Sequence, residues 1–180
     1  MINMYKNKKI IAFIPARKGS KRIKNKNGRL INGKQLFEYS IEVAKSSKYI
    51  DKIIFSTDSK EWLEYAQKLG CEKNNLRPKS LSDDNARIID AIIYELENLH
   101  FKEYDAIVTL QPTSPYRSSE LLDSAIEEYF KTETSLITIV EAKEQPIFMR
   151  RIVDGKLVKI VSNTSDIRSQ DFEKIYRIIG

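Results

Sequence analysis

Short, mainly apolar segments alternate along this chain with segments whose apolar residues recur at the period of an α-helix, and this alternation limits the folds open to it. The short segments have the composition of strands that are buried on both faces of a sheet. They are residues 9–14, 52–56, 104–110 and 135–140. Helical periodicity covers residues 36–47, 59–69, 86–99 and 118–129. Strands that alternate with helices predict an α/β fold, in which a mostly parallel sheet carries helices on both faces.

The length and the C-terminal pattern define the expected domain organisation. A chain of 180 residues predicts one domain, residues 1–180. Within it, Asp154-Gly155 separates two β-like runs, 148–153 and 156–161, and predicts a hairpin. Residues 165–176 have a weak helical pattern.

Positive charge is concentrated behind the first predicted strand. The chain has a net charge of +6, and no acid interrupts the basic residues between positions 17 and 34. These residues are Arg17, Lys18, Lys21, Arg22, Lys24, Lys26, Arg29 and Lys34. Parallel sheets bind ligands outside the carboxyl ends of their strands, so the segment predicts a local anion site. Gly19 and Ser20 allow backbone amides to turn toward an anion, Lys21 and Lys26 add charge for a triphosphate, and Arg17 offers a planar set of donors.

Three further segments carry candidate chemistry. The loop Leu110-Gln-Pro-Thr-Ser-Pro-Tyr-Arg117 is stiffened by two prolines, and its Gln111 has the donor and acceptor atoms that suit recognition of a base or a sugar acyl group. Either Asp58 or Ser59 is expected to cap the helix that follows, and Asp58 has a metal ligand as its alternative role. Gly28 to Gln35 nearly matches a Walker-type phosphate loop but lacks the Ser or Thr that would hold magnesium at position 35.

Composition also indicates where such a chain works. The single cysteine, Cys71, permits no disulfide within one chain, which favours a cytoplasmic location and a core position for that residue. The apolar run at 10–14 is too short for a signal peptide or a membrane span, so no membrane partner is expected. The basic segment lacks the interleaved aromatic residues of single-strand binding surfaces, so nucleic acid is not expected as a partner either.

Four distinctive motifs follow one another along the chain. They are Ile11-Ala-Phe-Ile-Pro-Ala-Arg-Lys-Gly-Ser-Lys-Arg22 with Lys26-Asn27, then Ser56-Thr-Asp58, then Arg77-Pro78 with Leu81-Ser-Asp83, and finally Leu110-Gln-Pro-Thr-Ser-Pro-Tyr-Arg117. Together and in this order they resemble the motifs of the acylneuraminate cytidylyltransferases, also called CMP-sialic acid synthetases, and the resemblance spans residues 9 to about 177.

The resemblance implies a Rossmann-like nucleotidyltransferase domain, a homodimer, and a projecting dimerisation segment at roughly 141–170. It implies that CTP and a nine-carbon α-keto acid sugar react to give a CMP-sugar and pyrophosphate, with Mg2+ as cofactor. Lys21 and Arg17 would be catalytic. The nucleotide and the sugar would be bound by Arg17, Gly19, Ser20, Lys21, Lys26, Asn27, Ser82, Gln111, Arg168 and Arg177.

The end of the chain departs from the family pattern. Ser169 replaces an arginine, Glu173 a proline and Ile179 an asparagine, and the acidic motif that holds magnesium is absent from the sequence, so the metal ligands are unknown. The chain is therefore expected to be a C-terminally shortened member. The alternatives are a weak or inactive homologue that binds nucleotide or only dimerises, and a nucleic-acid binder that uses the basic loop.

Overall fold

A computed structural model describes residues 7–20, 23–98, 103–161 and 173–179. The chain divides into two compact units, Met1–Leu136 and Ile137–Gly180. The expectation of one domain over residues 1–180 stays a prediction. The first unit contains every residue that lines a cavity formed by residues 15–27, 77–88 and 111–113.

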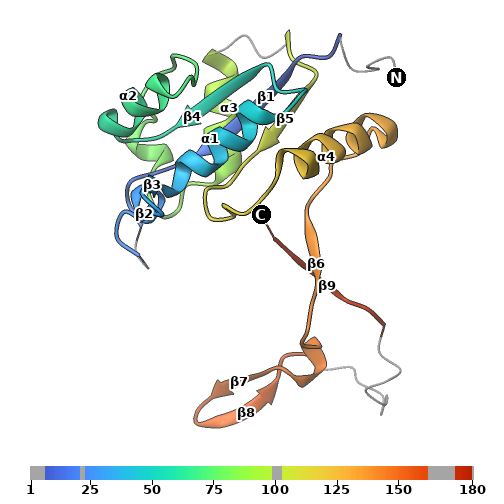
Figure 1. Ribbon diagram of the computed structural model, residues 1–180. Helices are drawn as coiled ribbons and strands as arrows, with labels where there is room; N and C mark the ends of the chain where they lie inside the picture. Colours follow the sequence, from blue (N-terminus) through green and yellow to red (C-terminus); the bar gives the residue numbers. More distant parts are fainter. Residues whose placement is uncertain (1–6, 21–22, 99–102, 162–172, 180) are drawn as a thin grey trace. The chain divides into compact units, whose positions relative to one another are not determined.

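A three-stranded parallel sheet forms the centre of the first unit (Figure 1). Its central strand is β1 (Ile10–Pro15), with β4 (Lys52–Ser56) on one side and β5 (Ala106–Thr109) on the other. The register pairs Ile14 with Phe55 and Phe13 with Thr109. The predicted strands at 9–14, 52–56 and 104–110 are confirmed, because runs that are apolar at successive positions can be buried only between two layers.

Helices cover both faces of this sheet, as the alternation predicts. On one face, Ile10, Ala12 and Ile14 pack in a cluster with α1 (Leu36–Ser46), α2 (Lys60–Lys68) and α4 (Ser119–Thr132). On the other face, Ile11 and Phe13 pack against Ala91 of α3 (Ile88–Asn98). Successive side chains of β1 therefore point alternately into two separate hydrophobic cores. The α/β fold class is confirmed.

Local polar contacts fix where the helices begin. The Ser59 hydroxyl accepts a hydrogen bond from the Trp62 N–H at 3.4 Å, so Ser59 rather than Asp58 caps α2. Ser118 caps α4 in the same way. Cys71 is buried in the larger core, where burial raises the pKa of its thiol to about 12 and keeps it protonated and inert.

A tight hairpin occupies the segment that resembles a Walker loop. Strands β2 (Leu30–Ile31) and β3 (Lys34–Gln35) pair antiparallel across Asn32 and Gly33. Both turn residues have positive φ, 49° and 80°, as the favoured two-residue hairpin turn requires. A hairpin that leads into α1 is not a loop that wraps a phosphate, so the Walker alternative is wrong.

The second unit is built from two small antiparallel pairs. Strand β6 (Ile139–Glu141) pairs with β9 (Tyr176–Ile178), and β7 (Arg150–Val153) pairs with β8 (Lys156–Lys159) after the 3-10 turn η4 (Pro146–Phe148). Asp154 and Gly155 form the turn of the second pair with positive φ, which confirms the predicted hairpin.

Two of the predicted segments, 135–140 and 165–176, fall in or next to the second unit. The strand predicted at 135–140 is wrong as a member of the parallel sheet: it begins at Ile139 and pairs antiparallel with β9, a partner far along the chain that its apolar pattern could not specify. The weak helix predicted at 165–176 lies mostly outside the described residues, and Tyr176 begins a strand. Among the described residues, no helix has the length and apolar character needed to cross a membrane.

Candidate functional site

A cavity of about 230 Å³ opens at the carboxyl edge of the parallel sheet. Three segments meet there: the loop after β1, residues 77–88, and the loop after β5. The central position of β1 between β4 and β5 brings these loops together, as expected where ligands bind in open parallel sheets. The cavity is lined by Pro15, Arg17, Lys26, Asn27, Arg77, Leu81, Asp83, Ala86, Arg87, Ile88, Gln111, Pro112 and Thr113.

The basic loop after β1 is held in place by hydrogen bonds from its own backbone and from one buried amide. The Lys18 N–H donates to Asp58 Oδ1 at 2.6 Å, so this aspartate anchors the loop instead of capping α2. The Asn27 side chain, which is buried, donates to the Arg17 carbonyl at 3.1 Å. Asn27 is the middle residue of the 3-10 segment η1 (Lys26–Gly28). These hydrogen bonds therefore fix the backbone of the loop that bears the cationic side chains.

Arg17 joins the basic loop to the segment that follows the 3-10 turn η2 (Lys79–Leu81). Its Nη1 donates to the carbonyl oxygens of Asp83 at 2.6 Å and Ser82 at 3.3 Å, and its Nη2 forms an ion pair with Asp84 at 3.1 Å. The planar guanidinium suits this arrangement, because several donors act in one plane. Ser82 takes part through its carbonyl, since its hydroxyl donates to Pro78 O at 3.0 Å.

Beneath the cavity lies a buried polar network centred on Arg77. Its Nε donates to Ser56 Oγ at 3.0 Å and its Nη2 donates to Ser56 O. Ser56 Oγ in turn donates to Glu95 Oε1 at 2.8 Å, and the Asn74 amide donates to Glu95 Oε2 at 3.1 Å. Burial lowers the pKa of Arg77, while Asp58 and Glu95 oppose that change, and burial raises the pKa of Glu95.

The raised pKa of Glu95 predicts a pH-dependent contribution to stability. Because the folded pKa lies above the unfolded one, the folded state binds more protons between the two values, and stability falls as pH rises through that window. Glu95→Gln removes this titration and keeps an acceptor for Ser56. We expect the unfolding free energy of the variant to increase relative to wild type as pH rises above the ordinary glutamate range. Urea unfolding at several pH values from acid to neutral measures it; a constant difference between the two proteins would contradict it.

The loop after β5 is fixed from inside by Arg117. Its Nε donates to Ser114 O at 2.9 Å and its Nη2 donates to Gln111 O at 2.5 Å, while the Leu110 N–H continues the sheet by donating to Phe13 O. Gln111 lines the cavity, and in the described part of the chain its side-chain amide has no hydrogen-bond partner. The amide is therefore available to recognise a ligand.

The structure brings together four of the residues predicted from the sequence. Arg17, Lys26, Asn27 and Gln111 all line the cavity. Gly19 and Ser20 lie in the same loop but do not line the cavity, and Ser82 contributes a carbonyl to Arg17. Of the remaining predicted residues, Lys21 and Arg168 lie outside the described residues, and Arg177 lies in β9 of the second unit.

Sequence reasoning missed four polar residues that line the cavity: Arg77, Asp83, Arg87 and Thr113. Arg77 and Asp83 belong to a quoted motif, which was a signal that they lie near the site. Arg87 had no such signal, because an arginine at the start of a predicted helix is normally solvated; here too its side chain is 74% exposed, and it pairs with Asp90 at 2.6 Å. The segment 86–88 also places the N-terminal end of α3 at the cavity, where backbone N–H groups favour anions.

The acids beside the cavity do not form a magnesium site among the described residues. Asp58 accepts from Lys18, Asp83 Oδ1 accepts from the Asn85 and Ala86 N–H groups at 2.8 Å, and Asp84 pairs with Arg17. Within the described ranges, no group of three or more His, Cys, Asp or Glu side chains could hold a metal ion. The donor set present therefore does not fit a magnesium ion bound by protein ligands alone.

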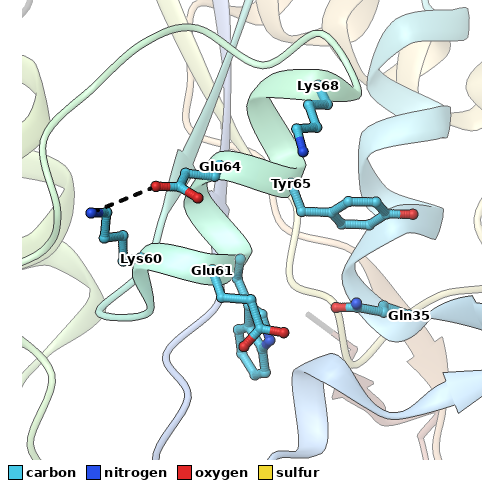
Figure 2. Close-up of a pocket in the computed structure, with 7 residues that line it drawn as sticks. Gln35, Lys60, Glu61, Glu64, Tyr65 and Lys68 are labelled. Carbon is cyan, nitrogen blue, oxygen red and sulfur yellow. Dashed lines mark ion pairs between the residues drawn. The ribbon is translucent and has the colours of Figure 1, made fainter.

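A second, larger hollow of about 470 Å³ lies along α2, where Glu61 also pairs with Lys18 of the basic loop at 3.4 Å. Figure 2 shows that Lys60, Glu61, Glu64 and Lys68 extend from α2, with Gln35 across from Tyr65. Lys60 and Glu64 form an ion pair at 3.9 Å. Acids and bases alternate here, so the hollow has no excess of positive charge, and we assign the anion site to the smaller cavity.

Comparisons with known proteins identify the family of the chain. The chain matches the cytidylyltransferase family over residues 11–174. It is 36% identical over 154 residues to the CMP-N,N'-diacetyllegionaminic acid synthase of Legionella pneumophila, covering 84% of this chain and 66% of that protein. It is 33% identical to a Helicobacter pylori protein named pseudaminic acid cytidylyltransferase and UDP-2,4-diacetamido-2,4,6-trideoxy-beta-L-altropyranose hydrolase, covering 94% of this chain and 33% of that protein.

Solved structures support the fold. A CMP:2-keto-3-deoxy-manno-octonic acid synthetase complexed with CTP superposes with a TM-score of 0.69 at 18% identity, covering 96% of this chain and 72% of that one. At this identity the likeness shows the fold alone. The chain spans less than two thirds of the length of both curated relatives described above. The sequence match, which runs through the cavity-lining segments of the first unit, shows that the chain belongs to the cytidylyltransferase family.

Proposed function

We propose that this protein transfers CMP from CTP to a nine-carbon α-keto acid sugar and releases pyrophosphate. One observation carries the proposal: the carboxyl-edge cavity gathers Arg17, Lys26, Arg77 and Arg87 beside the open amide of Gln111. Cations and the start of α3 suit a polyphosphate, and an amide with both donor and acceptor atoms suits a base or an acyl group. The relatives named for legionaminic and pseudaminic acids support the class of sugar.

The chemistry needs positioning and charge neutralisation more than covalent help. The anomeric hydroxyl of the sugar attacks the α-phosphorus in line, a new P–O bond forms, and the bond to pyrophosphate breaks. Lys26 lies where it can neutralise the phosphates, and Arg17 fixes the loop that carries it. Lys21 would add to this charge, and Arg168 and Arg177 would bind the sugar carboxylate; these roles rest on the family resemblance.

Magnesium enters the proposal only as an ion that would bind together with the triphosphate. It would supply charge neutralisation at the phosphate oxygens, and it ordinarily keeps several waters and takes few protein ligands.

Pyrophosphate release from CTP, assayed with magnesium across N-acetylneuraminate, legionaminate and pseudaminate, tests the proposal. We expect release with one of these sugars and little with GTP. Lys26→Ala should lower kcat/KM by about 10- to 100-fold, because it removes one charge-assisted contact to phosphate. Lys60→Ala is the matched control: its side chain is 84% exposed and lines the other hollow, so activity should be unchanged. Equal activity of both variants would overturn the assigned role of Lys26.

We further propose that the protein works as a homodimer through its second unit. Ile152 and Leu157 face one another across the β7–β8 pair and are each 73% exposed, and other apolar side chains of this unit are exposed as well. Exposed apolar surface of this extent is typical of an interaction site. Sedimentation equilibrium should give a mass of twice the chain; a monomer at all concentrations would contradict the proposal.

The two alternatives are less well supported. An inactive homologue would bind CTP without releasing pyrophosphate, and relatives named as synthases and cytidylyltransferases do not favour it. A nucleic-acid binder would show steeply salt-dependent binding with no preference for CTP. A cytoplasmic location is proposed because CTP and sugar acids are soluble metabolites; fractionation of cells that express the protein would test it.

A further inference from the structure

Arg77 lies in the cavity wall with part of its guanidinium unbonded. The residue is only 6% exposed, and it lines the cavity. Nε and Nη2 donate to Ser56, whereas Nη1 has no hydrogen-bond acceptor within the described ranges. Nη1 is not fully buried and can be reached from the cavity. A ligand in the cavity that offers an acceptor atom could therefore take its hydrogen bonds.

The orientation of this guanidinium is set by residues behind it. Ser56 Oγ has one proton, and it donates that proton to Glu95 Oε1 at 2.8 Å. Its lone pairs are then left to accept from Arg77 Nε at 3.0 Å. Glu95 is held by Asn74 on its other oxygen at 3.1 Å. A carboxylate, a hydroxyl and a guanidinium thus form a chain in which each member fixes the next.

Neither Ser56 nor Glu95 reaches the cavity. Ser56 is 0% and Glu95 is 1% exposed, and neither is among the lining residues. We propose that Ser56 and Glu95 are positioning residues for nucleotide binding, which hold Arg77 so that Nη1 can donate to an acceptor atom of the nucleotide. This inference rests on the proposed function, because it assumes that the cavity holds CTP.

The test is calorimetric titration of CTP into folded variants, with folding checked by circular dichroism. Ser56→Ala removes the link between Glu95 and Arg77 and should weaken CTP binding about tenfold, the value of one hydrogen bond to a charged group. The matched control is Ser40→Ala in α1. Ser40 is 1% exposed, and its hydroxyl has no hydrogen-bond partner in the described structure, so binding should stay within about twofold of wild type.

A double-mutant cycle separates positioning from general destabilisation. If Ser56 acts through Arg77, then Ser56→Ala should have no further effect on CTP affinity in an Arg77→Met background. If the two losses add, Ser56 acts only through the fold and the inference is overturned. Should Ser56→Ala fail to fold, Ser56→Cys keeps the volume while weakening both hydrogen bonds, and it should shift the affinity in the same direction.

The outcomes also distinguish this inference from the function on which it rests. If wild-type protein does not bind CTP, the proposed function fails and this inference fails with it. If wild type binds CTP and Ser56→Ala binds it equally well, only the positioning role fails. The network predicts weak CTP binding in Ser56→Ala, and weaker binding in Glu95→Ala than in Glu95→Gln, which keeps an acceptor for Ser56; equal binding by the two Glu95 variants would overturn the role of Glu95.

Discussion

Replacing Gly28 by alanine is expected to lower the free energy of unfolding by about 1–3 kcal/mol, the range for overpacking in a well-packed site. A Cβ at this position would lie 2.3 Å from Cζ2 and 2.8 Å from Cε2 of Trp62. The Trp62 ring is buried and packs against Phe37, so it has little room to move. The φ of Gly28 lies outside the left-handed region, so the cost is steric. Thermal or urea unfolding measures it.

Gly19→Ala is the control for this effect, because nothing lies within 4 Å of the Cβ that it would add. Its stability should equal that of wild type or exceed it slightly, since alanine restricts the unfolded chain. In a Trp62→Leu background, Gly28→Ala should lower the free energy of unfolding by less than it does in wild type, because the smaller side chain leaves room for the added Cβ. Equal stability of the two glycine variants would mean that Gly28 is not packed against Trp62 of α2.

Arg17→Ala should weaken CTP binding by about 100-fold or more. The loss has two sources: one cavity-lining cation disappears, and the contacts to Ser82, Asp83 and Asp84 that join two walls of the site are broken. Two charge-assisted hydrogen bonds of about 1.5–3 kcal/mol each account for an effect of this size. Arg17→Lys should recover only part of it, because an ammonium group lacks the planar set of donors. Calorimetric titration gives both affinities.

Arg29→Ala is the matched control, since it removes the same charge from a nearby exposed residue that does not line the cavity. Its affinity for CTP should fall by no more than a few-fold through the loss of general positive charge. If Arg17→Ala and Arg29→Ala weaken CTP binding equally, the effect comes from net charge, and the cavity is not the binding site.

The fold class and the position of the candidate site could both be predicted from the sequence. Continuous apolar runs predict buried parallel strands, and the basic loop after the first of them identifies the edge where Arg17, Lys26 and Asn27 meet. Gln111 could be predicted as well, because its loop follows another strand of the same sheet and therefore ends at the same edge.

What the sequence did not reveal depends on contacts between distant residues. Asp58 was expected as a cap or a metal ligand, and only the folded chain brings its carboxylate to the Lys18 N–H. The partnership of Arg77 with Ser56 and Glu95 depends on the packing of α3 against the sheet, which no local pattern encodes. The pairing of β6 with β9 was not predicted for the same reason: an apolar run indicates a strand but not its partner.

Amide hydrogen exchange with and without CTP tests most directly where the nucleotide binds. The account predicts that CTP slows exchange in the segments that line the carboxyl-edge cavity, residues 15–18, 26–28, 77–88 and 111–113, and leaves residues 60–68 of α2 unchanged. Slower exchange confined to residues 60–68, or no change anywhere at saturating CTP, would contradict it.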